Sequence, residues 1–513
     1  MIISLVVIAI VGYYTYKWIL YPLYISPLCK IPGPPPDHFL LGNFVKIFKE
    51  EVGHPQIKWT IDYGGVLCYR SLFNRPRVFI TDPKALQHVL STNVYDYPKP
   101  KMAFVSSVVG NGILMAEGEV HRRQRKMMNP IFSYSNVKEM IPSFAKVAHT
   151  LKDIWIEKLN NREDIIDIVP YLSQATLDVI GIVGFNYQFN SLTTTNELAT
   201  AYEMVFHPKN RENLIIRILS NNFPMFEKLP IKSNIQKKEA LKIIHNVSEN
   251  LVRERLEEAK RGELQGTDLL TMLVKINEQA EEKMSFDELK NQIMTFLAAG
   301  HETTSVATGW ALYYLSKDQE SQSLLREELM EEFPDKNFVP TFDQINDLEY
   351  LNAVVKETLR IVPPVPIVVR KPKKDDVING YVIPKGTPVF ISPNTVHRLP
   401  SIWGQDADDF KPSRWLIDSS FVITAPDTSM GSFSDSNLVD DKPVTNYTWM
   451  PFITGTRNCI GGKLALNEMK VLLAVLIRNF RFREIEGFEV KRKMSITLRP
   501  DPTIKLWVEE MEN

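Results

Sequence analysis

Apolar residues recur at helical spacing through residues 293–315, which predicts one long and largely buried helix. Residues 237–264 are rich in charge instead, as is typical of a long helix on the surface. Short β-like runs at 66–69 and 78–81 stand between amphipathic helical stretches. We therefore expect a fold that is mainly helical, with strands in a small part of it.

The first 20 residues are almost entirely apolar, and Lys17 carries their only charge. This stretch is short for a spanning helix, and a secretory signal is the rival interpretation. No small-residue cleavage site follows it, whereas tyrosines and Lys30 do, as at a membrane interface. A stiff proline-rich segment comes next. We expect an uncleaved membrane anchor at residues 1–30, a hinge at 31–36 and one large folded domain at 37–513.

Composition narrows the class of protein further. The chain has 513 residues, with 60 basic and 61 acidic side chains, so nothing in its charge indicates binding to nucleic acid. Cys29, Cys68 and Cys459 are its only cysteines, which argues against a disulfide framework and fits a reducing compartment. Residues 418–441 are rich in Ser, Asp and Gly, and we expect an exposed loop there.

The richest motif is the run F-x-x-G-x-R-x-C-x-G from Phe452 to Gly461. Gly455 permits a tight turn where a Cβ would collide with a flat macrocycle, and Arg457 offers a planar fork of donors for a carboxylate. Cys459 precedes what reads as the start of a helix, whose N-terminal field favours a thiolate. Phe452 is suited to covering the sulfur. The pattern predicts a thiolate ligand for haem iron; the alternative is a buried structural cysteine.

A second motif, A-G-H-E-T-T, lies within the long apolar stretch. Gly300 lacks a side chain, which predicts room beside the helix for a small ligand. Glu302 and Thr303 are costly in a buried helix unless they have partners. Thr303 can donate to a carbonyl one turn earlier and loosen the helix. An acid and an alcohol at this point predict a proton relay; the alternative is a threonine pair that bends the helix for packing.

These motifs resemble the cytochrome P450 family, and in particular its eukaryotic microsomal members, including fungal ones. The resemblance covers most of the chain from about residue 30 onward. It implies the cytochrome P450 fold, mainly α with a small β-rich subdomain. Glu357, Arg360 and Arg414, in E-x-x-R and P-x-R-W motifs, resemble the family's structural triad, to which we assign a role in folding.

The resemblance also implies residues that face the haem propionates. Arg125 matches the arginine of the family's W-x-x-x-R motif, whereas His121 stands where the tryptophan is usual. Arg370 resembles a further propionate-facing arginine, and Gly461 completes the cysteine motif. Residues 122–126 are either a solvated basic face or a dock for an acidic electron donor.

The activity implied by the resemblance is monooxygenation of a lipophilic substrate. Haem b would be the cofactor, with Cys459 as axial ligand, and Gly300, Glu302 and Thr303 would act at dioxygen. Electrons would come from NADPH through NADPH-cytochrome P450 reductase, with cytochrome b5 as a further donor, because the chain has no flavin or dinucleotide motif in the required context. The expected location is the endoplasmic reticulum membrane. A haem-thiolate isomerase, dehydratase or peroxygenase and a haem-thiolate sensor are the alternatives.

By resemblance, the substrate pocket draws on an apolar set of residues. The set comprises 102–109, Phe206, 214–226, Phe296, Ala299, 365–368, Ile496 and Thr497. Arg217 is its only charge and is suited to a carboxylate or to solvent. A long-chain fatty acid is the first substrate hypothesis; a sterol, terpenoid or xenobiotic is the alternative. Ala299 stands where one ω-hydroxylase branch has an ester-linked Glu, so no covalent haem link is expected.

Overall fold

The structure is a computed structural model, which describes residues 2–206, 231–416, 438–439, 442–443 and 445–511. The chain forms two compact units, each assembled from three separate stretches of sequence. The first unit comprises Met1–Lys101, Lys356–Cys459 and Glu489–Pro502. The second comprises Met102–Val355, Ile460–Phe488 and Thr503–Asn513. Cys459 therefore belongs to the first unit, and the A-G-H-E-T-T motif belongs to the second.

A four-stranded sheet organises the first unit, in the order β1-β2-β7-β4. Its strands are β1 (Val66–Arg70), β2 (Pro76–Ile80), β7 (Val389–Ile391) and β4 (Val368–Arg370). β2 and β7 are parallel, and the other two pairs are antiparallel. The strands predicted at 66–69 and 78–81 are confirmed, although β2 ends one residue earlier than predicted.

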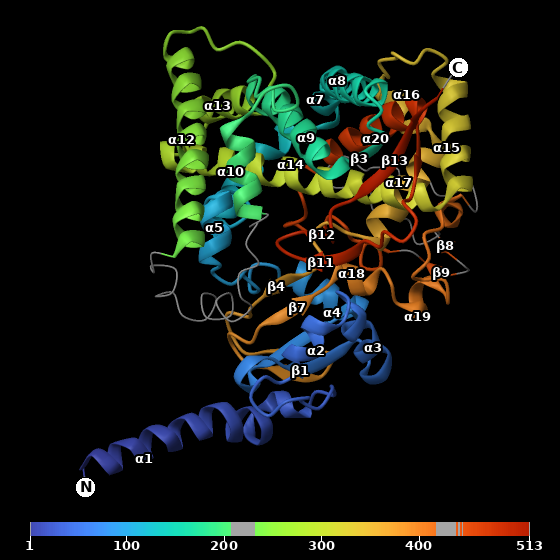
Figure 1. Ribbon diagram of the computed structural model, residues 1–513. Coiled ribbons are helices and arrows are strands. Elements are labelled where there is room, and N and C mark those ends of the chain that lie inside the picture. The colour runs from blue at the N-terminus through green and yellow to red at the C-terminus, as the bar shows by residue number, and fades with distance from the viewer. Residues whose placement is uncertain (1, 207–230, 417–437, 440–441, 444, 512–513) are drawn as a thin grey trace. The chain divides into compact units, whose positions relative to one another are not determined.

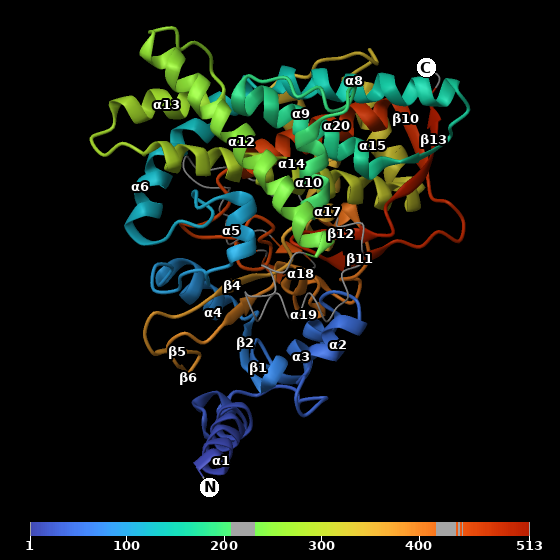
Figure 2. The same cartoon turned by 60° about the vertical axis from the view of Figure 1, so that its left-hand side comes forward.

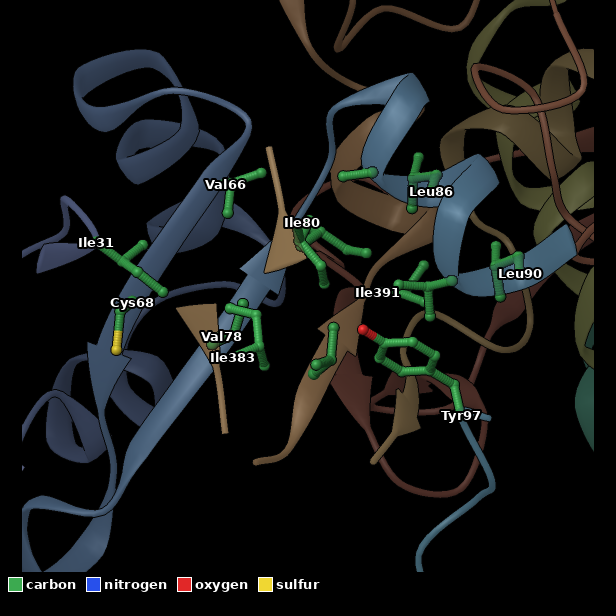
Figure 3. Packing of buried hydrophobic residues seen from close by; sticks show 14 of the residues in the cluster. Ile31, Val66, Cys68, Val78, Ile80, Leu86, Leu90, Tyr97, Ile383 and Ile391 are labelled. Carbon is green, nitrogen blue, oxygen red and sulfur yellow. The ribbon is translucent and has the colours of Figure 1, made fainter. Parts of the chain in front are cut away.

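Both faces of this sheet are buried, which explains why its strands read as nearly continuous apolar runs. Successive side chains of a strand point to opposite faces. Val78 and Ile80 pack into one cluster, together with Leu90, Tyr97 and Ile391 (Figure 3). The intervening strand residues belong to a second cluster on the other face. That cluster contains Trp59, Leu67, Tyr69 and Phe79.

Short helices and hairpins complete the first unit. Its helical segments are η2 (Pro27–Lys30), α2 (Phe44–Lys49), α3 (His54–Tyr63), η3 (Leu72–Asn74), α4 (Pro83–Gln87), η4 (His88–Thr92), the C-terminal half of α17 (Glu349–Ile361), α18 (Pro393–Val396), α19 (Pro400–Trp403) and η7 (Pro412–Trp415). Its hairpins pair β5 (Asp376–Ile378) with β6 (Tyr381–Ile383), β8 (Leu438–Val439) with β9 (Lys442–Pro443), and β11 (Lys491–Met494) with β12 (Leu498–Asp501). The loop predicted at 418–441 lies mostly outside the described residues.

The N-terminal segment forms α1 (Ile2–Thr15) and η1 (Tyr16–Ile25), and α1 projects from the first unit in both views (Figures 1 and 2). The span Ile3–Lys30 is long and apolar enough to cross a membrane, and none of its most apolar window is buried. The ring of Trp18 stacks on that of Phe73, with centroids 4.7 Å apart. The helix matches the predicted anchor, whose insertion in a membrane stays a prediction.

The second unit is built around α14 (Phe286–Lys317), which packs against α5 (Ala103–Val109), α9 (Ile168–Phe185), α12 (Lys232–Lys260) and α20 (Gly462–Asn479) (Figure 1). The helix predicted at 293–315 is confirmed and is longer at both ends. A capping box at Ser285 and Glu288 satisfies backbone N–H groups where α14 begins. The predicted charged helix is also confirmed, as α12.

The remaining elements of the second unit are largely helical. They are α6 (Gly118–Met128), η5 (Asn129–Phe132), α7 (Tyr134–Lys138), α8 (Ile141–Asn160), α10 (Glu197–Phe206), α13 (Leu269–Gln279), α15 (Gln319–Glu332) and α16 (Phe342–Asp347). A sheet in the order β10-β13-β3 joins β10 (Phe480–Arg483), β13 (Lys505–Glu510) and β3 (Ile165–Asp167). The predicted fold class, mainly α with a small β part, is confirmed.

Candidate active site

The cysteine loop in the first unit is closed by its own backbone. The Cys459 N–H donates to the Phe452 carbonyl at 2.9 Å, and the Asn458 N–H donates to the Gly455 carbonyl at 3.1 Å. Arg457 and Asn458 are buried, whereas Cys459 is exposed. The loop thus presents an accessible cysteine directly after two buried residues. α20 begins at Gly462, directly after the motif, as the sequence predicted.

The structure shows a different reason for Gly455 from the one expected. Its φ of 79° lies in the left-handed region, and a Cβ there would stand 2.2 Å from the Leu90 carbonyl oxygen. Ile453 also has a positive φ, of 59°. The glycine is therefore required by the close approach of another backbone segment, and not only by a macrocycle. Phe452 is half-buried, and its predicted cover of the sulfur stays a prediction.

Buried ion pairs support this loop from α17. Glu357 is fully buried and receives two bonds from Arg360, each 2.8 Å long, and one of 3.2 Å from Arg414. The Trp415 indole N–H donates to the same carboxylate at 2.9 Å. Burial raises the pKa of Glu357, but the charges of Arg360 and Arg414 outweigh it, so the pKa lies below its ordinary value. The triad predicted from the resemblance is brought together, in a structural role.

His397 is a supporting residue that the sequence did not reveal. Its Nε2 accepts the Met450 N–H at 2.8 Å, and its Nδ1 lies 3.2 Å from the Arg360 carbonyl oxygen. The ring is fully buried, and burial, followed by the charge of Arg360, lowers its pKa to about 3. This neutral imidazole joins α17 to the backbone just before the cysteine loop. The sequence around His397, which follows α18, does not predict this contact.

Arg370 and Arg457 are both buried guanidinium groups of the first unit. Arg370 lies at the end of β4 and donates to the Val369 carbonyl at 3.0 Å. Arg457 lies within the cysteine loop itself. Both are chemically suited to a carboxylate. Their contact with haem propionates stays a prediction.

In the second unit, α14 is buried through most of its length but opens at one place. Ala299 is exposed, and Gly300 and Thr303 are half-buried, although Glu302 and Thr304 beside them are buried. These three positions lie on one face of the helix, because residues four apart are neighbours on its surface. The Thr303 hydroxyl donates to the Ala299 carbonyl at 2.8 Å, as predicted. This open face therefore presents the Thr303 hydroxyl beside Ala299 and Gly300.

On the side where Gly300 would carry a Cβ, α14 packs against α9, and the predicted room for a small ligand beside Gly300 stays a prediction. A Cβ at Gly300 would lie 3.0 Å from the Ile180 side chain of α9. The glycine thus permits the close packing of α9 on α14. The Thr176 hydroxyl, also on α9, donates to the His301 carbonyl at 2.8 Å and strengthens this contact.

Glu468 in α20 was also missed by reasoning from the sequence. Its side chain is fully buried near the Thr304 hydroxyl of α14. Burial raises the pKa of this carboxyl well above its usual value. A glutamate among apolar helix positions could have drawn attention, but only the packing of α20 on α14 shows that it is buried.

His121 and Arg125 lie about one turn apart on α6. His121 is buried, and Arg125 is half-buried and donates to the Asn129 side chain at 2.7 Å. Arg123 pairs with Glu288, so the basic run is only partly a solvated face. The propionate contacts of His121 and Arg125 stay predictions. Residues 214–226 of the predicted pocket lie outside the described residues.

The donor set fits haem. In the described part of the chain, no group of three or more His, Cys, Asp or Glu side chains is arranged to hold a metal ion. One accessible thiol instead suits a metal whose other ligands come from a macrocycle. The buried guanidinium groups of Arg370 and Arg457 match the carboxylates that haem carries.

Comparison with known proteins agrees with this chemistry. The family model described as cytochrome P450 matches residues 32–508. Cytochrome P450 monooxygenase 205 of Postia placenta is 35% identical, with 93% of this chain and 90% of that protein covered. Cytochrome P450 monooxygenase FUM15 of Gibberella moniliformis is 32% identical, with 95% and 88% covered. The chain belongs to the cytochrome P450 family.

Membership of this family has further implications for the activity, cofactor and partners of the protein. The protein is an enzyme, a cytochrome P450 monooxygenase. Its family implies haem with thiolate ligation of the iron, a redox partner and, in general, a lipophilic substrate. The alternatives of a sensor or a haem-thiolate enzyme that does not oxygenate are thereby set aside.

Proposed function

We propose that this protein is a membrane-anchored monooxygenase that oxidises a long-chain fatty acid, with electrons from NADPH-cytochrome P450 reductase. Cys459 is the proposed residue that would hold haem through its thiolate. The bound group would supply the activation of dioxygen, with one oxygen atom going to a C–H bond of the substrate and the other to water. The observation that carries this assignment is that Cys459 is exposed on a loop closed by its own backbone, directly after the buried Arg457 and Asn458.

The open face of α14 supports a role for its own residues in moving protons. Thr303 donates its hydroxyl hydrogen to the Ala299 carbonyl and remains accessible, so its oxygen is able to accept a hydrogen bond from a ligand or water on that face. Glu302 precedes it and is buried, which suits an acid that resupplies protons rather than one that binds solvent directly. We assign proton delivery to this pair.

Apolar side chains that remain accessible support a lipophilic substrate. Met102 is exposed and Phe104 is half-buried at the start of α5, and Ala299 is exposed on α14. Val365 and Val368 are partly accessible in the first unit. Such surfaces favour an apolar ligand. A fatty acid stays the first substrate hypothesis and a sterol or terpenoid the alternative; Arg217, suited to a carboxylate or to solvent, lies outside the described residues.

The proposed location is the endoplasmic reticulum membrane, with residues 1–30 as the anchor. The support is the unburied apolar span Ile3–Lys30. The basic residues of α6, among them Arg122 and Lys126, are exposed and suit an acidic reductase, with cytochrome b5 as a further donor. Both partners are expected to bind more weakly as salt concentration rises.

The first test is the carbon monoxide difference spectrum of reduced membranes that contain the full chain. Wild type should show the strongly red-shifted band of a thiolate complex, and Cys459→Ser should lose it. Cys29→Ser is the matched control, because Cys29 is also exposed but lies within the anchor segment, outside the cysteine loop. A red-shifted band in Cys459→Ser would refute the ligand assignment. Binding spectra with fatty acids, sterols and terpenoids then test the substrate.

A further inference from the structure

The backbone behind the cysteine loop comes from η4, the π-helix His88–Thr92. The Leu90 carbonyl occupies the place where Gly455 would carry a side chain. The Ser91 hydroxyl is 2.9 Å from the Tyr447 hydroxyl, on the segment that leads into the loop. Leu90 also packs in the same buried cluster as Ile453 and Met450. A displacement of η4 would therefore displace the cysteine loop.

One carboxylate holds the start of this π-helix and the segment that follows it. Asp376 in β5 accepts from His88 Nε2 at 2.8 Å and from the Tyr97 hydroxyl at 2.8 Å, both on the same oxygen. Its other oxygen accepts the Val377 N–H at 2.8 Å. The Asn93 amide nitrogen lies 3.2 Å from His88 Nδ1 and 3.0 Å from His88 Nε2, so Asn93 also contacts the imidazole ring. His88 begins η4, and Tyr97 follows shortly after it.

The surroundings make this cluster rigid. Tyr97 is fully buried beside Leu90, and Figure 3 shows its ring among the aliphatic side chains of the core. Backbone bonds at 2.9 Å join Lys373 to Asp96 and Lys371 to Pro98. Lys374 also forms an ion pair with Asp96 at 3.0 Å. The segment after η4 is thus fastened along its length to the segment that contains Asp376.

Protonation supports the same arrangement. Burial raises the pKa of Tyr97, and its bond to Asp376 raises it further, so the phenol is a donor throughout the physiological range. Burial raises the pKa of Asp376, but bonds from His88, Tyr97 and Val377 outweigh it and leave the pKa below its ordinary value. Hydrogen bonds to an ionised acceptor are stronger than neutral ones.

We propose that His88, Tyr97 and Asp376 are positioning residues that hold η4 against the cysteine loop and so keep the Cys459 sulfur in place for the haem iron. This inference rests on the proposed thiolate ligation by Cys459. None of the three residues touches the reacting atoms in this role. They act through Leu90 and Ser91, whose backbone and hydroxyl meet the loop.

The test compares His88→Leu and His88→Gln in the full chain in membranes, since glutamine retains a donor for Asp376 and leucine does not. In His88→Leu, the red-shifted carbon monoxide band should convert to the unshifted band about tenfold faster. Loss of a charge-assisted hydrogen bond raises the population of the displaced cysteine loop by about that factor, and the conversion proceeds from the displaced loop. His88→Gln should convert at a rate close to that of wild type. Hydrogen–deuterium exchange in residues 88–92 and 447–459 should rise in His88→Leu only.

His54→Leu is the matched control. His54 also lies in the first unit and pairs with a carboxylate, that of Glu50, at 2.9 Å, but this pair does not include Asp376 or Tyr97. An equal effect of His54→Leu, an equal effect of His88→Gln, or unchanged exchange in residues 447–459 would overturn the proposal. If His88→Leu does not fold, Tyr97→Phe, which removes only a hydroxyl, takes its place with the same expected outcome. If wild type shows no red-shifted band, the ligation assignment fails, while the exchange data still decide whether the cluster holds the loop.

Discussion

Replacing His397 with glutamine should make the stability of this protein less sensitive to acid. His397 is buried and neutral in the folded state, where its Nε2 accepts the Met450 N–H. Glutamine keeps an acceptor and a donor at this place but does not titrate. The substitution therefore removes a protonation event while it preserves much of the hydrogen bonding.

The size of the effect follows from the shift of the pKa. In an unfolded chain the imidazole has a pKa of about 6.5, and in the folded protein burial and the charge of Arg360 lower it to about 3. A lowered pKa contributes stability that is fully present above the unfolded value and is lost as pH falls toward the folded value. Each pH unit in that window is worth about 1.4 kcal/mol. Between pH 7.5 and 4.5, wild type should lose about 2.7 kcal/mol more than the variant.

The assay is denaturant unfolding of the detergent-solubilised full chain at both pH values, followed by tryptophan fluorescence. The quantity compared is the change in the free energy of unfolding between the two pH values, in wild type and in His397→Gln. His54→Gln is the control, since His54 is well exposed and should change that difference little. If wild type and His397→Gln lose the same stability in acid, the reasoning that His397 is held neutral by burial is refuted.

Three further substitutions test the site. Glu468→Gln should gain stability relative to wild type as pH rises above about 4.5. The pKa of Glu468 is raised in the folded protein, so the stability that this acid contributes is present below its unfolded pKa and is lost as pH rises above it. Parallel pH profiles of the free energy of unfolding would contradict this prediction. Gly455→Ala should lower the yield of the red-shifted carbon monoxide complex. Gly386→Ala should not, because Gly386 has a similar φ of 77° but no atom near the position of a Cβ. Equal losses would mean that backbone strain, and not the contact with Leu90, decides the outcome. Thr303→Ala should release more peroxide per NADPH consumed, measured in a reconstituted system, and unchanged coupling would remove the threonine from proton delivery.

The motifs that identify the chemistry are local, and they could be predicted from the sequence. The spacing of Gly455, Arg457 and Cys459 specifies a turn, a fork of donors and a sulfur within a few residues of one another. The helical period through residues 293–315 likewise predicted α14, because burial on one helix repeats every three to four positions. The strands at 66–69 and 78–81 were also predicted from a local pattern, namely short runs of strand-forming residues.

What the sequence could not predict are the contacts between segments that lie far apart along the chain. A side chain at Gly455 would collide with the carbonyl of Leu90, and one at Gly300 would press on the side chain of Ile180, and neither neighbour is evident from the sequence. His397 and Glu468 owe their shifted pKa values to burial that only the packing of distant helices and loops creates.

The sequence by itself thus determined the family, the cysteine loop and the helix that carries Glu302 and Thr303, since these depend on neighbouring residues. The tertiary structure alone decided which backbone meets Gly455, which carboxylate holds His88, and which acids and bases lose their contact with water. Those properties arise when folding brings separate segments within a few ångströms of one another, and no local pattern of residues records that approach.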